Sequence, residues 1–173
     1  MVVLARASID HILPDNGSGH RRHDEYTYYE EGPQFGYLKD EIVDAPNLAL
    51  TTTYEYDLVG NVIRKLDPKR NDIQFIVNQL DQVVRETSRD VRPADIIVPN
   101  PTVIHYEKDF HYDANDNLVR EDIQNKDENG FLLPNTHFTT TYEYEVLNYR
   151  VRETREVAEG HNIVEEYAYD GNP

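Results

Sequence analysis

The chain has 173 residues, a length that predicts one domain or slightly more. Its 33 acidic residues outnumber its 17 Lys and Arg residues, and the resulting net charge of −16 argues against binding to nucleic-acid phosphates or to an anionic membrane. The chain has no cysteine, which excludes disulfides, thiolate metal sites and a cysteine nucleophile. Val, Ile, Leu and Phe make up 25% of the residues, which exceeds the roughly 20% level below which highly charged chains are disordered and so predicts a packed core.

The N-terminal segment shows no targeting signal. The apolar run Met1–Ala5 is soon interrupted by Arg6 and Asp10, so it lacks the apolar middle of a signal peptide. No run elsewhere approaches the roughly 20 apolar residues of a membrane-spanning helix. We expect residues 1–23, which include Asn16-Gly17-Ser18-Gly19, to form a polar lead-in. Asn16-Gly17-Ser18 also fits the N-glycosylation pattern, which matters only in a eukaryotic secretory pathway.

From residue 24 onward a short motif recurs. It consists of two aromatic residues separated by one residue, then an acid, about three further residues, an Asn and an apolar-rich run. Four copies begin at residues 54, 110, 142 and 167, and two degenerate copies begin at residues 26 and 75. Two of the copies share six residues in a row, in Thr51–Asp57 and Thr139–Glu145. We therefore predict an array of about six repeats over residues 24–173, joined by connectors of variable length.

Each repeat has the pattern of a β-hairpin. Tyr54 and Tyr56 alternate with a polar residue, which is the period of a strand with one packed and one wet face. Asp57 and Gly60 match the first and fourth positions of a type I turn. Val62–Leu66 is the predicted return strand, because Pro68 directly beyond it cannot donate to a sheet.

The predicted fold is therefore all-β, with consecutive antiparallel hairpins in a twisted, open strip. A single hairpin cannot bury its aromatic face alone, so we expect stability to come from neighbouring hairpins. The residues that we expect to pack are Tyr54, Tyr56, Phe110, Tyr112, Tyr142, Tyr144, Tyr167 and Tyr169. Those that we expect to shape the turns are Asp57, Gly60, Asn61, Asp113, Asn117, Asp170 and Gly171.

Three segments fit the repeat less well. In residues 73–88 the apolar spacing is also that of a helix stripe, so helix and hairpin both stay open, although the repeat register favours a hairpin. Residues 89–101 contain three prolines, and residues 124–136 contain Asp127-Glu128-Asn129-Gly130. We expect both to be irregular connectors.

The Tyr-x-Tyr-Asp-x-x-Gly-Asn units, with Asp67-Pro68 between two of them, resemble the YD repeats of rearrangement-hotspot (Rhs) proteins. Related repeats occur in the B and C components of bacterial insecticidal toxin complexes and in teneurins. In that family the hairpins form a spiralling sheet that closes into a hollow shell, which in bacterial members encloses a C-terminal toxin. The resemblance, over residues 24–173, implies a non-catalytic shell segment of an exported or cell-surface protein, with flanking repeats and an enclosed toxin domain as its partners.

The chain also departs from the family. It holds too few units to close a shell, it ends within a unit, and it lacks the C-terminal autoproteolytic segment and toxin domain of bacterial members. We therefore expect it to be a segment of a longer chain. The alternative is a β-repeat module at a cell surface, in which the tyrosine-rich sheet binds carbohydrate or a protein partner.

A metal site and a calcium site are the first two chemical candidates. His20 and His23, beside Asp24 and Glu25, could bind zinc, but their region has the composition of a polar loop. Residues 113–117 resemble the first half of a calcium loop, but Leu118 and Gln124 stand where that loop needs Gly and Glu. We favour the structural explanation for both, and expect neither metal nor cofactor.

The third candidate is a hydrolase that uses one of the chain's adjacent acids, which are Glu30-Glu31, Asp40-Glu41, Glu121-Asp122 and Glu165-Glu166. A glycosidase needs two carboxyl groups that face one another across a cleft. Neighbouring residues of a strand point to opposite faces of the sheet, so none of these pairs is a good local dyad. The prediction is that the chain is not an enzyme.

Overall fold

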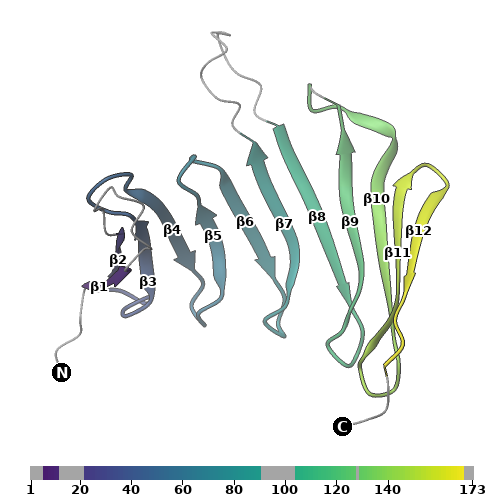
Figure 1. Ribbon diagram of the computed structural model, residues 1–173, viewed down its shortest axis with the longest axis horizontal. Coiled ribbons are helices and arrows are strands. Elements are labelled where there is room, and N and C mark those ends of the chain that lie inside the picture. The colour runs from purple at the N-terminus through teal and green to yellow at the C-terminus, as the bar shows by residue number, and fades with distance from the viewer. Residues whose placement is uncertain (1–5, 12–21, 91–103, 128, 170–173) are drawn as a thin grey trace. The chain divides into compact units, whose positions relative to one another are not determined.

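The computed structural model describes residues 6–11, 22–90, 104–127 and 129–169, and over these residues it has twelve β-strands and no helix (Figure 1). The strands are β1 (Arg6–His11), β2 (Arg22–Tyr28), β3 (Leu38–Val43), β4 (Leu50–Tyr56), β5 (Val62–Leu66), β6 (Asp72–Val77), β7 (Val83–Asp90), β8 (Ile104–Tyr112), β9 (Leu118–Lys126), β10 (Leu132–Tyr144), β11 (Arg150–Ala158) and β12 (His161–Glu166). The all-β prediction is confirmed. No helix long enough to cross a membrane occurs in these described ranges.

The order of strands in the sheet follows the order in the chain, from β1 to β12, and the sheet is open. Consecutive strands pair antiparallel, as in β4 with β5 and β8 with β9. The chain divides between Phe75 and Ile76, within β6, into two compact units. Unit 1 covers residues 1–75 and unit 2 covers residues 76–173, and each is described by itself.

Of the two structures predicted for residues 73–88, the hairpin is the one observed, because β6 and β7 flank a turn at residues 78–82. The helix alternative is wrong. Two residues of its supposed apolar stripe, Ile76 and Leu80, are 57% and 75% exposed.

The predicted lead-in and connectors contain more strand than expected. Residues 6–11 of the lead-in form β1, which pairs with β2 from Arg6 to His11 although it carries no copy of the motif. β7 extends through Asp90 into the first connector, and residues 91–103 lie outside the described residues. The second connector is strand on both sides of a short turn. Its irregular part is a register shift between Leu132 and His137, around Pro134, which cannot donate to the sheet.

Strand pairing gives the sheet two chemically different faces in unit 2. Arg85, Asp109, Asp122 and Thr139 pair in register and form one row across β7 to β10. We call the face that carries this row the polar face. The residues one position further along each strand lie on the opposite face, which carries Phe110 and Tyr142. We call this the aromatic face.

Few side chains in the described ranges are fully buried. Asp24 is the only one below 2% exposure, and most large apolar side chains remain in contact with solvent. Burial of apolar area therefore contributes little within a hairpin, and the hydrogen bonds and ring contacts between hairpins become correspondingly important.

Candidate functional site

One turn geometry recurs at six places in the described structure. The backbone N–H of the first turn residue donates to the carbonyl of the fifth at 2.9–3.1 Å. The first and fifth residues are Asp57 and Asn61, Asp67 and Asn71, Asn78 and Gln82, Asp113 and Asn117, Asp127 and Phe131, and Glu145 and Tyr149. The fourth residue always has a positive φ, between 60° and 106°. This is a type I turn closed by a left-handed residue.

The Asp and Asn of the motif are partners in this turn. Asp57 Oδ1 accepts from the backbone N–H groups of Val59, Gly60 and Asn61 at 2.8–3.0 Å, and Oδ2 accepts from Asn61 Nδ2 at 3.0 Å. Desolvation raises the pKa of Asp57, but these hydrogen bonds outweigh it, so the pKa is lowered overall. Asp113 Oδ1 likewise accepts from the backbone N–H groups of Asn115 and Asn117, and its Oδ2 accepts from Asn117 Nδ2.

Both the backbone conformation and a close neighbour favour glycine at position 60. Besides its φ of 106°, a Cβ at this position would lie 2.9 Å from the hydroxyl oxygen of Tyr37. The side chain of Tyr37 in turn packs on Tyr56, with ring centroids 5.0 Å apart.

In the last three copies of the motif, the second aromatic residue connects its strand to the hairpin before it. Its hydroxyl donates to the backbone carbonyl of the residue that directly follows the preceding turn. The three bonds run from Tyr112 to Val83 (3.0 Å), from Tyr144 to Leu118 (2.8 Å) and from Tyr169 to Arg150 (2.8 Å). We call this contact the tyrosine link. In unit 1, Tyr56 instead contacts the ring of Tyr29, edge to face at 6.5 Å.

Replacing Tyr144 by Phe keeps the ring and removes the link to Leu118. The variant should lose about 1 kcal/mol of unfolding free energy, the usual contribution of one hydrogen bond. Urea unfolding followed by circular dichroism measures the change. The matched control is Tyr149→Phe in the adjacent turn, where the side chain is 51% exposed. Equal losses in the two variants would show that the link contributes nothing specific.

The first aromatic residue of the motif contacts a cation of the same sheet. Lys65 lies 5.9 Å from the ring centroid of Tyr54, and Lys108 lies 4.8 Å from that of Phe110. Arg150 contacts two rings, Tyr142 at 5.5 Å and Tyr167 at 4.9 Å. These rings are therefore already in contact with charged groups of the chain.

A buried acid completes the charges around Arg150 on the aromatic face. Glu153 is 7% exposed, and its Oε2 lies 3.1 Å from Arg150 Nη1. Burial raises the pKa of the Tyr142 hydroxyl to about 12, and the negative charges of Glu121 and Glu153 add to the increase. Tyr142 is therefore neutral throughout the physiological pH range.

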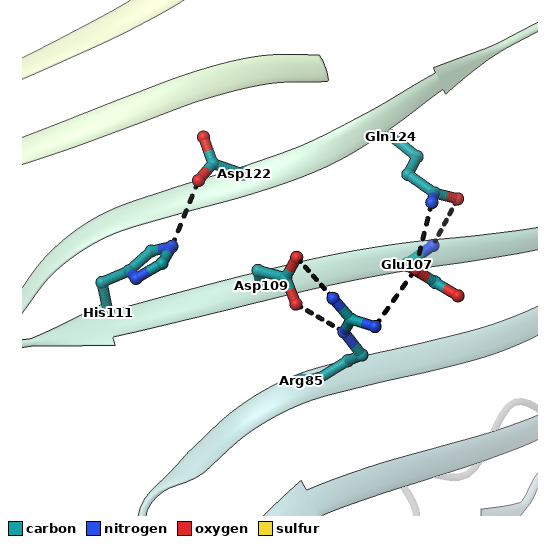
Figure 2. A network of polar contacts seen from close by, with 6 residues as sticks. All are labelled: Arg85, Glu107, Asp109, His111, Asp122 and Gln124. Atoms are coloured by element: carbon teal, nitrogen blue, oxygen red, sulfur yellow. Dashed lines mark hydrogen bonds and ion pairs between the residues drawn. The ribbon is translucent and has the colours of Figure 1, made fainter. Parts of the chain in front are cut away.

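The polar face carries a hydrogen-bonded network across β7, β8 and β9 (Figure 2). Arg85 binds both carboxylate oxygens of Asp109, at 2.6 and 2.9 Å, and lies 3.4 Å from Glu107. Glu107 in turn accepts from Gln124 Nε2 at 3.1 Å, and its backbone N–H donates back to the Gln124 side chain at 3.2 Å. His111 Nε2 lies 3.2 Å from Asp122 Oδ2.

Asp122 is the most enclosed member of this face, at 8% exposure. Its carboxylate accepts from the Thr139 hydroxyl at 2.6 Å, and Arg120 Nε lies 2.8 and 3.0 Å from its two oxygens. Desolvation raises the pKa of Asp122, but the bonds from Thr139, Arg120 and His111 outweigh it and the pKa is lowered. Asp122 is thus held as a carboxylate, which does not suit a general acid.

An open pocket of about 330 Å³ lies over this network, and its lining residues are Asp109, His111, Arg120, Asp122 and His137. Two imidazoles, two carboxylates and one guanidinium could hold a small polar molecule. Both carboxylates are engaged within the sheet, however. Over the described residues no three His, Asp or Glu side chains are placed to bind a metal ion.

Three residues of the candidate zinc site lie in the described part of the chain, where His23 Nε2 is 3.5 Å from Glu25 Oε1. His20 lies outside the described residues, while His23, Asp24 and Glu25 follow one another on β2. The Asp24 carboxylate accepts from Arg22 Nε and Nη2 and from the backbone N–H of Asp44. The acids are therefore engaged in the fold, since Glu25 also bonds to Arg6.

The acids of the calcium-loop candidate and of the Glu121-Asp122 pair also have partners in the described fold. The carboxylate of Asp113 serves its own turn, in the segment that resembles a calcium loop. Glu121 and Asp122 lie on opposite faces, where Glu121 pairs with Lys108 at 3.1 Å. Asp170 and Gly171 lie outside the described residues. The sequence motifs do not predict the row that contains Arg85, Asp109 and Thr139. Its members belong to different repeats, and only strand register brings them together.

No protein-family model matches the chain, and no curated protein matches it. Among solved structures, it is similar to a crystal structure of TcdB2-TccC3-Cdc42, at 18% identity and a TM-score of 0.45, over 87% of this chain and 10% of that chain. It is also similar to the Photorhabdus luminescens Tc holotoxin pore with a mutated TccC3, at 18% identity and a TM-score of 0.42, over 87% of this chain and 10% of that chain. A third similar structure is a crystal structure of TcdB2-TccC3-TEV, at 16% identity and a TM-score of 0.41, over 86% of this chain and 11% of that chain. The chain thus spans about a tenth of each of these chains.

Proposed function

We propose that this chain is a non-catalytic structural segment, part of the wall of a YD-repeat shell. The observation that carries the proposal is the tyrosine link together with the recurrent turn. In the last three copies of the motif, all in unit 2, the motif Tyr bonds directly behind the preceding turn. The same residues that define the repeat therefore also join successive hairpins, which is what an extendable wall requires.

The charges of the two faces support a structural role. Arg85 and Asp109 neutralise one another on the polar face, and Glu153 is paired with Arg150 on the aromatic face. Asp122, the most enclosed acid beside the pocket, has a lowered pKa. An acid or base for catalysis would instead need a pKa near the working pH.

By its resemblance to Rhs proteins, the wall would belong to an exported or cell-surface protein and would enclose or present a C-terminal toxin or effector domain. Its partners would be the flanking repeats and that domain. Lys65, Lys108 and Arg150 already contact the rings that would stack on a sugar, which weighs against the carbohydrate-binding alternative.

Cysteine labelling in the full-length protein that carries this segment tests the proposal. The segment itself has no cysteine, so each variant introduces the only thiol of the segment. His111→Cys places a thiol on the polar face and Ile123→Cys places one on the aromatic face. Both positions are exposed here, by 54% for the His111 side chain and 40% for Ile123. One reagent is N-ethylmaleimide, and the other is a maleimide that carries a long polyethylene glycol chain.

A shell wall predicts that both thiols react with the small reagent and that only the thiol on the outer face reacts with the large one. The isolated 173-residue chain is the control, in which both thiols should react with both reagents. Equal reaction of both thiols with the large reagent in the full-length protein would contradict the proposal.

A further inference from the structure

Three turns of unit 2 form a continuous row at one end of the strands. They are residues 78–82, 113–117 and 145–149, which we call the turn rim; they lie at the lower end of β6 to β11 in Figure 1. Side chains bond adjacent turns laterally. Gln82 bonds to Asp116, and Asn117 Nδ2 donates to Asn148 Oδ1 at 3.0 Å. The rim is therefore one surface and not three separate loops.

The tips of two of these turns carry large apolar side chains in solvent. Leu80 is 75% exposed, Val146 is 98% exposed and Leu147 is 72% exposed. The turn does not require them, because the equivalent positions of the turn between them are Ala114 and Asn115, and the middle of a type I turn accepts most residues. Leu80 stands at one end of the rim, and Val146 and Leu147 stand together at the other. Large exposed apolar side chains on one connected surface favour an interaction site.

The charge of the rim limits what can cover it. Its fifteen residues include four acids and neither Lys nor Arg, and the acids are Asp81, Asp113, Asp116 and Glu145. A second copy would bring the same charges to the interface, and an anionic membrane would be repelled as well. A partner with basic groups around an apolar stripe complements the rim in both respects.

We propose that the turn rim is a docking surface for a basic, amphipathic helical segment of another protein. The apolar face of that segment covers Leu80, Val146 and Leu147, and its Lys and Arg side chains face the four acids. This surface lies at the end of the strands and not on either face of the sheet. The proposal therefore does not depend on the shell.

The test uses the 173-residue chain and a synthetic helical peptide of Leu and Lys as the probe, with binding measured by fluorescence anisotropy. The chain should bind the peptide, and the double variant Val146→Ser, Leu147→Ser should bind it about tenfold more weakly, because two exposed apolar contacts are lost. Both side chains are largely in solvent, so the fold should survive, which circular dichroism checks. The control is Phe131→Ser, at a 71% exposed apolar residue of the β9–β10 turn, and it should leave binding unchanged.

Two further probes separate the sources of binding. A peptide in which Glu replaces each Lys should not bind, and vesicles of phosphatidylglycerol should not bind either. The proposal is overturned if the chain fails to bind the Leu–Lys peptide, or if the double variant binds it as tightly as the parent does. Equal loss in Phe131→Ser, equal binding of the Glu peptide, or vesicle binding that needs Val146 and Leu147 would also overturn it. None of these outcomes depends on which face of the sheet is shielded from the large maleimide. The docking proposal and the shell proposal can therefore be contradicted independently.

Discussion

Replacing Asp24 by Ala is expected to lower the unfolding free energy of unit 1 by about 1–3 kcal/mol, the cost of leaving buried partners without their acceptor. Asp24 is 1% exposed. It accepts from Arg22 Nε at 2.8 Å and Nη2 at 2.6 Å, and from the backbone N–H of Asp44 at 3.0 Å. Alanine is too small to fill the site and has no group that could replace the carboxylate.

Urea unfolding of Asp24→Ala measures this loss. The control is Glu31→Ala, which removes the same charge from an exposed residue between β2 and β3. The control should unfold within about 0.5 kcal/mol of the parent, as surface substitutions usually do. If both variants lose the same stability, the effect is one of net charge and the buried carboxylate has no special part in it.

The second large effect is expected for Asp122→Asn, which should lower the unfolding free energy by about 1–2 kcal/mol at pH 7. An amide cannot accept all the bonds that the carboxylate accepts from Thr139, Arg120 and His111. The pKa of Asp122 is lower in the folded chain than its ordinary value of about 3.9. Its contribution is therefore fully present above that ordinary value, and it is lost as the pH falls through the folded pKa.

The difference in stability between the parent and Asp122→Asn should accordingly begin to shrink below about pH 4. It should disappear once the pH has fallen through the lowered folded pKa, where the parent carboxyl is protonated and resembles the amide. Urea midpoints at several pH values from 7 down to 3 measure it. Glu121→Gln, on the other face of the same strand, is the control and removes the pair with Lys108. A difference that stays constant or grows on acidification would contradict the role assigned to Asp122.

The hairpins were predictable because their information is local. Asp57, Gly60 and Asn61 lie within five residues and carry the whole turn, and the alternation of Tyr54 and Tyr56 defines the strand before it. The same short pattern recurs, so one correct hairpin predicts the others. Even residues 73–88, where a helix stripe competes, follow the repeat.

The contacts between hairpins were not predictable, because they depend on register. Arg85 and Asp109 are 24 residues apart and are separated by a segment whose length no motif defines. Tyr144 was recognised as a packing residue, but its bond to the Leu118 carbonyl follows only from the position of the preceding turn. β1 was missed because it pairs by backbone hydrogen bonds with no aromatic motif of its own.

The central claim is that this chain is an array of hairpins, each held by its own turn and by its neighbours. Hydrogen–deuterium exchange of the full chain, read peptide by peptide in the parent, in Asp24→Ala and in Tyr144→Phe, tests it most directly. An array predicts faster exchange in β1 to β4 for the first variant and in β8 to β11 for the second, with the remaining strands as protected as in the parent. Faster exchange through all twelve strands in either variant would show a single cooperative domain and would contradict the account.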